Sequence, residues 1–134
     1  MTEKQLTLQK IQHIANVIDI VKGSATAKDI DGKAIYWLGR LRDYCTPVMK
    51  QIEDANTELI KKYTITDNGD GTRKINSEKY SIAYKKLVEE EKETIKMPEF
   101  KASQFFIGEK SMVPTEFWQI MTEHIEIDLD WMKE

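Results

Sequence analysis

Few side chains in this sequence have the types and spacings that catalysis or metal binding requires. His13 and His124 are the only histidines and lie far apart, and Cys45 is the only cysteine. A structural zinc site needs about four such ligands at short spacings, so we expect no zinc site. No serine or cysteine has a histidine and an acid close by in the sequence, although a catalytic triad is defined in space and could join distant segments. We expect a protein without cofactor or enzymatic activity, and we leave such a distant triad open.

Two short motifs resemble ligand-binding loops without meeting their requirements. If Gly71 took the sixth position of a calcium loop, the first and twelfth positions would be Thr66 and Ser77, and neither side chain carries a carboxylate. The segment Gly108–Ser111, GEKS, is similar to the end of a phosphate-binding loop, but its Gly-Lys pair is interrupted and the upstream glycine is missing. Neither motif predicts a ligand, and turn formation explains the glycines around residue 70.

The residues best suited to binding a partner are aromatic or acidic. Tryptophan is most often a core residue, but it is also favoured as an interface anchor. From Glu109 to the end of the chain there are seven acidic residues and two lysines, so the last quarter of the chain is acidic. We expect partner contacts at Trp37, Tyr44, Trp118, Asp128, Asp130 and Trp131.

The bulk composition indicates one globular domain, residues 1–134, with a mean hydropathy of −0.54. The net charge of −3 argues against a direct nucleic-acid ligand, which requires a basic surface. No segment approaches the roughly 20 apolar residues of a membrane span, and the N-terminus MTEKQLTLQK lacks the apolar core of a signal peptide. A single cysteine allows no internal disulfide. We expect a cytoplasmic protein that does not bind membranes.

The longest predicted element is a helix over residues 33–63, around which the rest of the chain is organised. Pro47 cannot donate a backbone hydrogen bond to Asp43, so we expect a kink between them within an unbroken helix. At about 1.5 Å per residue, such a helix is roughly 45 Å long and must pack against another helix, from this chain or a second copy. Its apolar seam alternates steps of four and three residues, as in helices that pair along their length: Ala34, Leu38, Leu41, Cys45, Val48, Ile52, Ala55 and Leu59.

The other elements follow from periodicity and turn chemistry. Residues 93–97 have a strand-like pattern, and residues 99–112 are expected to be irregular. The predicted elements are a first helix within residues 1–22 (from Thr7 to Lys22), a β-hairpin over 64–76, a third helix over 77–92, a fourth helix over 114–124, and an acidic tail, 125–134, with strand-like alternation. We therefore predict a mainly α fold, in which the long kinked helix and the third helix form an antiparallel helical hairpin. The first helix covers this pair, and a small β-hairpin and short strands accompany it.

Four segments of the chain resemble a family of small uncharacterised helical proteins encoded by bacteriophages and prophages, a domain of unknown function. They are LTLQKIQHIANVI, KAIYWLGRLRDYCTPVMKQIEDANTELIKKY, YKKLVEEEKETIKMPEF and VPTEFWQIM, which together span Leu6 to Met121. The resemblance implies a phage or prophage origin and a place in the bacterial cytoplasm, and it brings no catalytic residues.

Three functions remain in competition. The first is a non-enzymatic phage accessory protein that binds protein, either in virion assembly or by forming a homo-oligomer. The second is a phage-encoded inhibitor of a host enzyme or defence system that uses the acidic surface of the C-terminal quarter to imitate nucleic acid. The third is a small-molecule-binding protein or an enzyme, with a cleft at the kink between Trp37 and Tyr44. The apolar seam of the predicted helix 33–63 is longer than the other predicted helices that could cover it, and this favours the first function.

Overall fold

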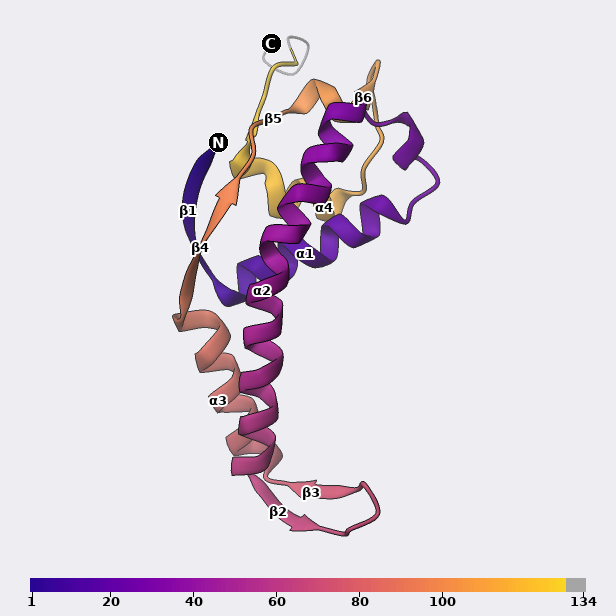
Figure 1. Cartoon of the computed structure of the whole chain (residues 1–134). Helices are drawn as coiled ribbons and strands as arrows, with labels where there is room; N and C mark the ends of the chain where they lie inside the picture. Colours follow the sequence, from indigo (N-terminus) through magenta and orange to yellow (C-terminus); the bar gives the residue numbers. More distant parts are fainter. Residues whose placement is uncertain (130–134) are drawn as a thin grey trace.

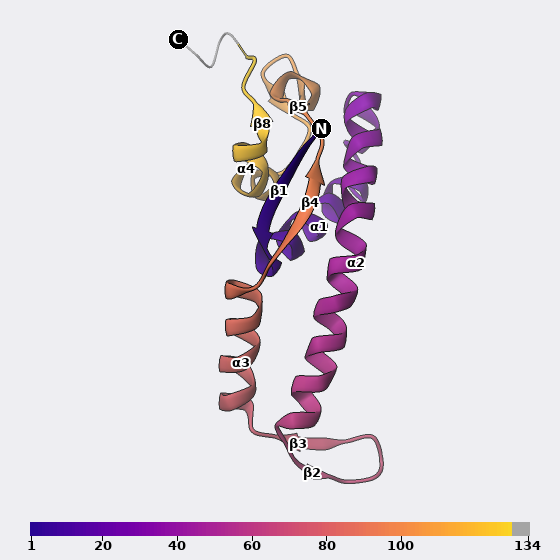
Figure 2. The same ribbon diagram turned by 60° about the vertical axis from the view of Figure 1, so that its left-hand side comes forward.

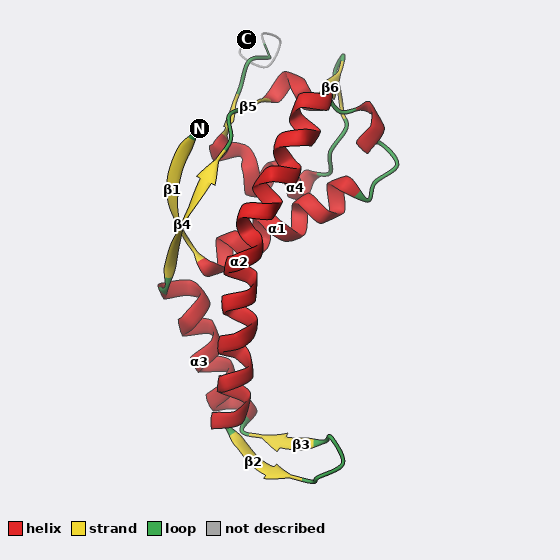
Figure 3. Cartoon of the chain, in the orientation of Figure 1, coloured by secondary structure: helices red, strands yellow, loops and turns green. Residues whose placement is uncertain are grey.

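Helices dominate the protein (Figure 3). The computed structural model describes residues 1–129, so the predicted contacts at Asp130 and Trp131 and the rest of the predicted tail, 130–134, lie outside the described residues. Within that range the four α-helices are α1 (Leu8–Lys22), α2 (Gly32–Lys62), α3 (Ser77–Glu90) and α4 (Thr115–Met121). The predicted mainly α class is confirmed.

Helix α1 lies at the centre of the fold. It begins after Thr7, whose side chain accepts a hydrogen bond of 3.2 Å from the backbone N–H of Lys10, the usual way to satisfy a free N–H at a helix start. Its apolar residues surround more than one side of the helix because α2 and α4 both pack against it (Figure 1). The buried residues of α1 are Leu8, Ile11, Ile14, Ala15, Val17, Ile18 and Val21.

Helix α2 runs unbroken from Gly32 to Lys62 with Pro47 inside it, and it curves gently along its length (Figure 2). The continuity agrees with the prediction, while a kink located at Pro47 stays a prediction. Asp31 caps the helix by accepting a hydrogen bond of 3.3 Å from the backbone N–H of Ala34. The buried side chains of α2 follow the predicted seam as far as Ile52. The seam therefore packs as the periodicity indicates over the first two thirds of the helix.

The start of the chain is a strand, which corrects the assignment of residues 1–22 to a helical segment. Strand β1 (Thr2–Thr7) pairs antiparallel with β4 (Lys92–Met97), and Thr2 lies opposite Met97. Strand β1 was not predicted because Leu6 is its only buried residue, so its apolar alternation is weak. Its partner also lies in the second half of the chain. The strand-like pattern of residues 93–97 does correspond to β4.

The segment after β4 combines short elements. It contains β5 (Phe100–Lys101), a 3₁₀ turn (Ala102–Phe105), β6 (Phe106–Ile107) and β7 (Lys110–Ser111). Helix α4 is shorter than the predicted 114–124, since Thr122–His124 form a 3₁₀ turn. In the part of the predicted tail that the structure describes, residues 125–129, the strand is β8 (Ile125–Glu126), which pairs in parallel with β5. Phe105 and Phe117, both fully buried, anchor this layer to the core.

The second half of α2 extends beyond these layers. It leads into strands β2 (Thr64–Asp67) and β3 (Arg73–Ile75), an antiparallel pair within the segment predicted as a hairpin. Gly69 and Gly71 have φ of +76° and +92°, a conformation that glycine adopts without steric cost. Helix α3 then runs back alongside α2 (Figures 1 and 2). Within residues 1–129, no helix combines the length and apolar character needed to cross a membrane.

Candidate functional site

The most distinctive surface of this protein is a thin projection built from two helices. We call residues 50–90 the arm: the second half of α2, strands β2 and β3, and helix α3. We call the other described residues, 1–49 and 91–129, the body. Figures 1 and 2 show the arm extending away from the body, with the β2–β3 hairpin at its far end. Two helices side by side leave both outer faces uncovered, so the arm has little core of its own.

Burial along the seam of α2 falls sharply between body and arm. Ala34, Leu38, Leu41 and Cys45 are fully buried, and Ile52 is 4 % exposed. Beyond Ile52 the seam continues through Ala55 and Leu59, but both are only half-buried. Helix α3 is also poorly buried, and Val88 is its only buried residue. The apolar repeat therefore continues into the arm, where the described residues bury its side chains only in part.

The arm is nevertheless held together by specific contacts. The Tyr80 hydroxyl donates a hydrogen bond to Asn56 Oδ1 across the two helices. Between the body and the arm, Gln12 Nε2 of α1 donates to the Tyr84 hydroxyl at 3.0 Å. Asn76 caps α3 by accepting a hydrogen bond of 3.1 Å from Lys79 N–H. These bonds fix how the two helices lie, so the exposed faces of the arm are presented in a defined geometry.

Two large apolar side chains of the arm are exposed to solvent. Ile65 in β2 is 60 % exposed and Ile82 in α3 is 63 % exposed. Ile82 lies two residues from both Tyr80 and Tyr84, which places it on the opposite side of the helix from those half-buried rings. Ile82 therefore faces away from α2. Its neighbours on that outer face, at spacings of three and four, are Glu78, Lys79, Lys85 and Lys86, and Glu89 lies two turns beyond Ile82; all are exposed.

Charge is divided between the two ends of the arm. We call residues 61–79 the tip, which has five basic and three acidic residues. We call residues 87–93, where the arm joins the body, the base; they include four acidic residues and one lysine. The acids at the base lie in the last turn of α3 and just beyond it, and that last turn contains no basic residue. The partial negative charge of a helix C-terminus favours cations and disfavours carboxylates. Glu89 and Glu90 make no ion pair with any described residue, so no side chain within residues 1–129 relieves this conflict.

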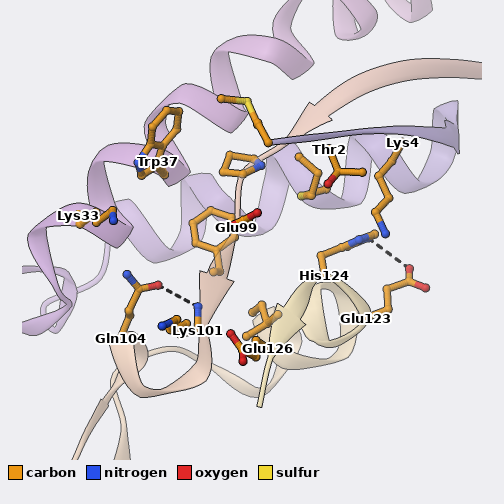
Figure 4. A pocket seen from close by; sticks show the side chains of 15 residues that line it. Thr2, Lys4, Lys33, Trp37, Glu99, Lys101, Gln104, Glu123, His124 and Glu126 are labelled. Atoms are coloured by element: carbon orange, nitrogen blue, oxygen red, sulfur yellow. Dashed lines mark hydrogen bonds and ion pairs between the residues drawn. The ribbon is translucent and has the colours of Figure 1, made fainter. Parts of the chain in front are cut away.

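A second candidate site is a cleft in the body of about 690 Å³ (Figure 4). It lies between the first turns of α2, the start of β1, the β4–β5 connection and the 3₁₀ turn before β8. Trp37 and Lys33 line it from α2, and Lys101 and Glu99 line it from the β4–β5 segment. Lysines and glutamates both surround this open cleft, so its charge selects neither an anion nor a cation.

His124 separates this cleft from a smaller hollow that also contains His13. Its side chain is 4 % exposed, its Nε2 lies 3.4 Å from Glu123 Oε1, and its Nδ1 has no hydrogen-bond partner among residues 1–129. Burial lowers the pKa of His124, Glu123 opposes that effect, and the nearby Lys4 and Lys10 reinforce it. Among residues 1–129 no three histidine, cysteine or acidic side chains gather as metal ligands would.

The structure does not bring the predicted site residues together. Trp37 lines the cleft and packs edge-on against Tyr36, whereas Tyr44 lies outside the cleft beneath the Arg40 guanidinium. Trp118 packs against Phe105, Phe106 and Phe117, and its indole N–H donates to Ser111 Oγ at 2.9 Å.

Asp128 is engaged within the chain. Its carboxylate accepts hydrogen bonds from the backbone N–H and the hydroxyl of Ser103, which lower the pKa of Asp128.

The sequence interpretation missed the outer face of α3. The one signal that could have found it is Ile82, an apolar residue at helical spacing among charged ones.

No protein-family model matches the chain, and no curated protein and no solved structure matches it. Any assignment of function therefore depends on the geometry of the arm and the cleft.

Proposed function

We propose that this protein works by binding protein through its arm and performs no chemistry of its own. In this proposal the arm is an antiparallel helical hairpin with a kinked first helix. In the setting that the family resemblance implies, the protein is a phage or prophage accessory protein in the bacterial cytoplasm, acting in assembly or by self-association. The observation that carries the proposal is the apolar seam, which is buried up to Ile52 and only half-covered beyond it. Exposed apolar surface at a defined geometry is typical of interaction sites.

The test compares two isoleucines of similar exposure. Ile82 on the arm is 63 % exposed and Ile20 on α1 is 55 % exposed, so each can be changed to glutamate without opening the core. Tagged wild type, I82E and I20E are used to capture proteins from phage-infected bacterial lysate after nuclease treatment, and what is retained is identified by mass spectrometry. Sedimentation velocity of each purified protein measures self-association.

We expect I82E to lose binding of a named partner, or to lose self-association, while I20E keeps both. Circular dichroism should show equal helix content in all three proteins. If wild type is monomeric at all concentrations and retains nothing that I82E fails to retain, the arm is not a binding surface and the proposal is wrong.

The cleft favours a second candidate function, binding of a small molecule. Trp37 offers an aromatic surface for stacking beside Lys33, one helical turn before it. A metabolite panel screened by thermal unfolding tests this, because a ligand that binds only the folded state raises Tm. A shift that is present in wild type and absent in W37A supports ligand binding at the cleft. Equal Tm values across the panel would contradict it.

A further inference from the structure

The outer face of α3 has a charge order that suits a second copy of the same helix. The exposed residues Lys79, Ile82, Lys86 and Glu89 are spaced by three, four and three residues, so they form one continuous stripe. This spacing is the same when it is read in either direction. The charges are not the same, because one end of the stripe is basic and the other is acidic.

The relative direction of two such stripes decides whether they attract. In a parallel pair, Lys79 would face Lys79 and Glu89 would face Glu89, and both contacts would be repulsive. In an antiparallel pair, Lys79 of each copy faces Glu89 of the other, and Ile82 of each copy packs on the aliphatic part of Lys86 of the other. The antiparallel pair also brings the basic tip of each arm to the acidic base of the other.

We propose that two copies of this protein associate through α3 in an antiparallel, two-fold symmetric pair of arms. The inference rests on the proposed function and specifies its partner. A two-fold axis suits this surface because the pair then makes two equivalent Lys79–Glu89 contacts, one at each end of the paired stripes. It also places a cation beside the C-terminal end of each α3, where the described chain provides none in the last turn.

The contact is small, which sets the expected affinity. Three helical turns paired with three helical turns bury less surface than the roughly 800 Å² per partner of a stable interface. We therefore expect dissociation constants of about 10–100 μM at low salt. Association should weaken as salt is raised, since exposed charge pairs are screened.

Charge reversal distinguishes the antiparallel pair from other arrangements. In K79E, both inter-copy contacts join two carboxylates, and in E89K both join two ammonium groups. Each variant alone should therefore associate about tenfold more weakly than wild type. When K79E and E89K are mixed, every contact in the mixed dimer again joins opposite charges, so the mixture should associate about as strongly as wild type. K28E serves as a matched control, because Lys28 is an exposed body residue and the charge change is the same.

Sedimentation velocity with one fluorescently labelled chain measures these affinities directly. Weakening in each single variant and recovery in the mixture support the inference, provided that K28E behaves as wild type. A dimer that I82E disrupts, but whose affinity the charge reversals leave unchanged, overturns the antiparallel geometry while the proposed function stands. A monomeric chain whose arm captures a different protein has the same consequence. A monomer that captures nothing through its arm removes both proposals.

Discussion

The imidazole of His124 is a buried base whose surroundings favour its neutral form. The side chain is 4 % exposed. Burial is the largest cause of its lowered pKa, and Lys4 and Lys10 add to the effect, while Glu123 acts in the opposite direction. The folded protein therefore takes up the proton of His124 at a lower pH than the unfolded chain, where the ordinary pKa is 6.5.

This difference predicts how the free energy of unfolding depends on pH. Below pH 6.5 the unfolded chain binds the proton more readily, so stability falls as pH is lowered from 6.5 towards the folded-state pKa. The contribution of neutral His124 is fully present above pH 6.5. Urea unfolding at pH 7.5 and at several values below 6.5 measures this decline. It should be smaller in H124Q and unchanged in H13Q, whose histidine is exposed. Equal declines in wild type and H124Q would contradict the prediction.

The rate at which the Cys45 thiol is chemically modified should report on unfolding. Burial is the main cause that raises its pKa from 9.0 to about 11, and the residue is fully buried in the seam of α2. Two pKa units reduce the reactive thiolate about hundredfold at pH 8, and burial blocks access in addition. We expect an aromatic disulfide reagent to modify Cys45 at least about a hundred times more slowly in the folded protein than in urea. Rapid modification of the folded protein would mean that the seam opens readily.

Residue types alone could identify few of the candidate site residues. Trp118 and Asp128 were reasonable choices for partner contacts by type, but their hydrogen bonds to Ser111 and Ser103 are made within the chain. Those partners come from segments without regular periodicity, which sequence patterns cannot place. Trp37 does line a cleft, but the opposite wall comes from β1 and β8, brought there by long-range strand pairing.

At the level of elements, helix α2 meets two environments along one repeating seam. Its first part is covered mainly by α1 and β4, and its second part mainly by α3 (Figure 1). Leu41 is fully buried and Leu59, on the same seam, is half-buried. Identical substitutions at these positions therefore separate the effect of cover from the effect of residue type.

L41A should cost far more stability than L59A. Removing a leucine side chain from a packed core costs about 2–5 kcal/mol, because transfer energy is lost and a cavity remains. At a half-buried site less surface is exposed by the truncation and solvent can fill the space, so we expect about 1 kcal/mol for L59A. Urea unfolding of the two variants at one low protein concentration measures both values. Similar losses would mean that the arm is covered as fully as the body.

The sequence predicts an element well when its signal is local and repeated. The seam of α2 repeats over many turns, and the turn around Gly69 and Gly71 requires positive φ, so both were visible without the structure. Strand β1 was missed because Leu6 is its only buried residue and its partner β4 is distant in sequence. Helix α4 was predicted too long because Thr122–His124 continue as a 3₁₀ turn, which has almost the same local pattern.

For the whole molecule, the division into body and arm implies two levels of stability. The body contains nearly all of the fully buried side chains, whereas the arm has Ile52 and Val88 as its buried apolar residues. Local opening requires little energy where few apolar contacts are lost. The arm of a single copy should therefore open more often than the body, and a second copy bound to α3 should reduce that opening.

Hydrogen exchange followed by mass spectrometry can measure both effects in one experiment. At low protein concentration, amides of α3 and of the second half of α2 should exchange faster than those of α1 and the first half of α2. Above the dissociation constant, exchange in α3 should slow with concentration, because opening then requires that the pair of arms separates first. The body should show no such dependence, and in K79E the slowing of α3 should require about tenfold higher protein concentration. If α3 exchanges at the same rate at every concentration, its outer face has no partner in solution, and the charge order of the stripe has some other origin.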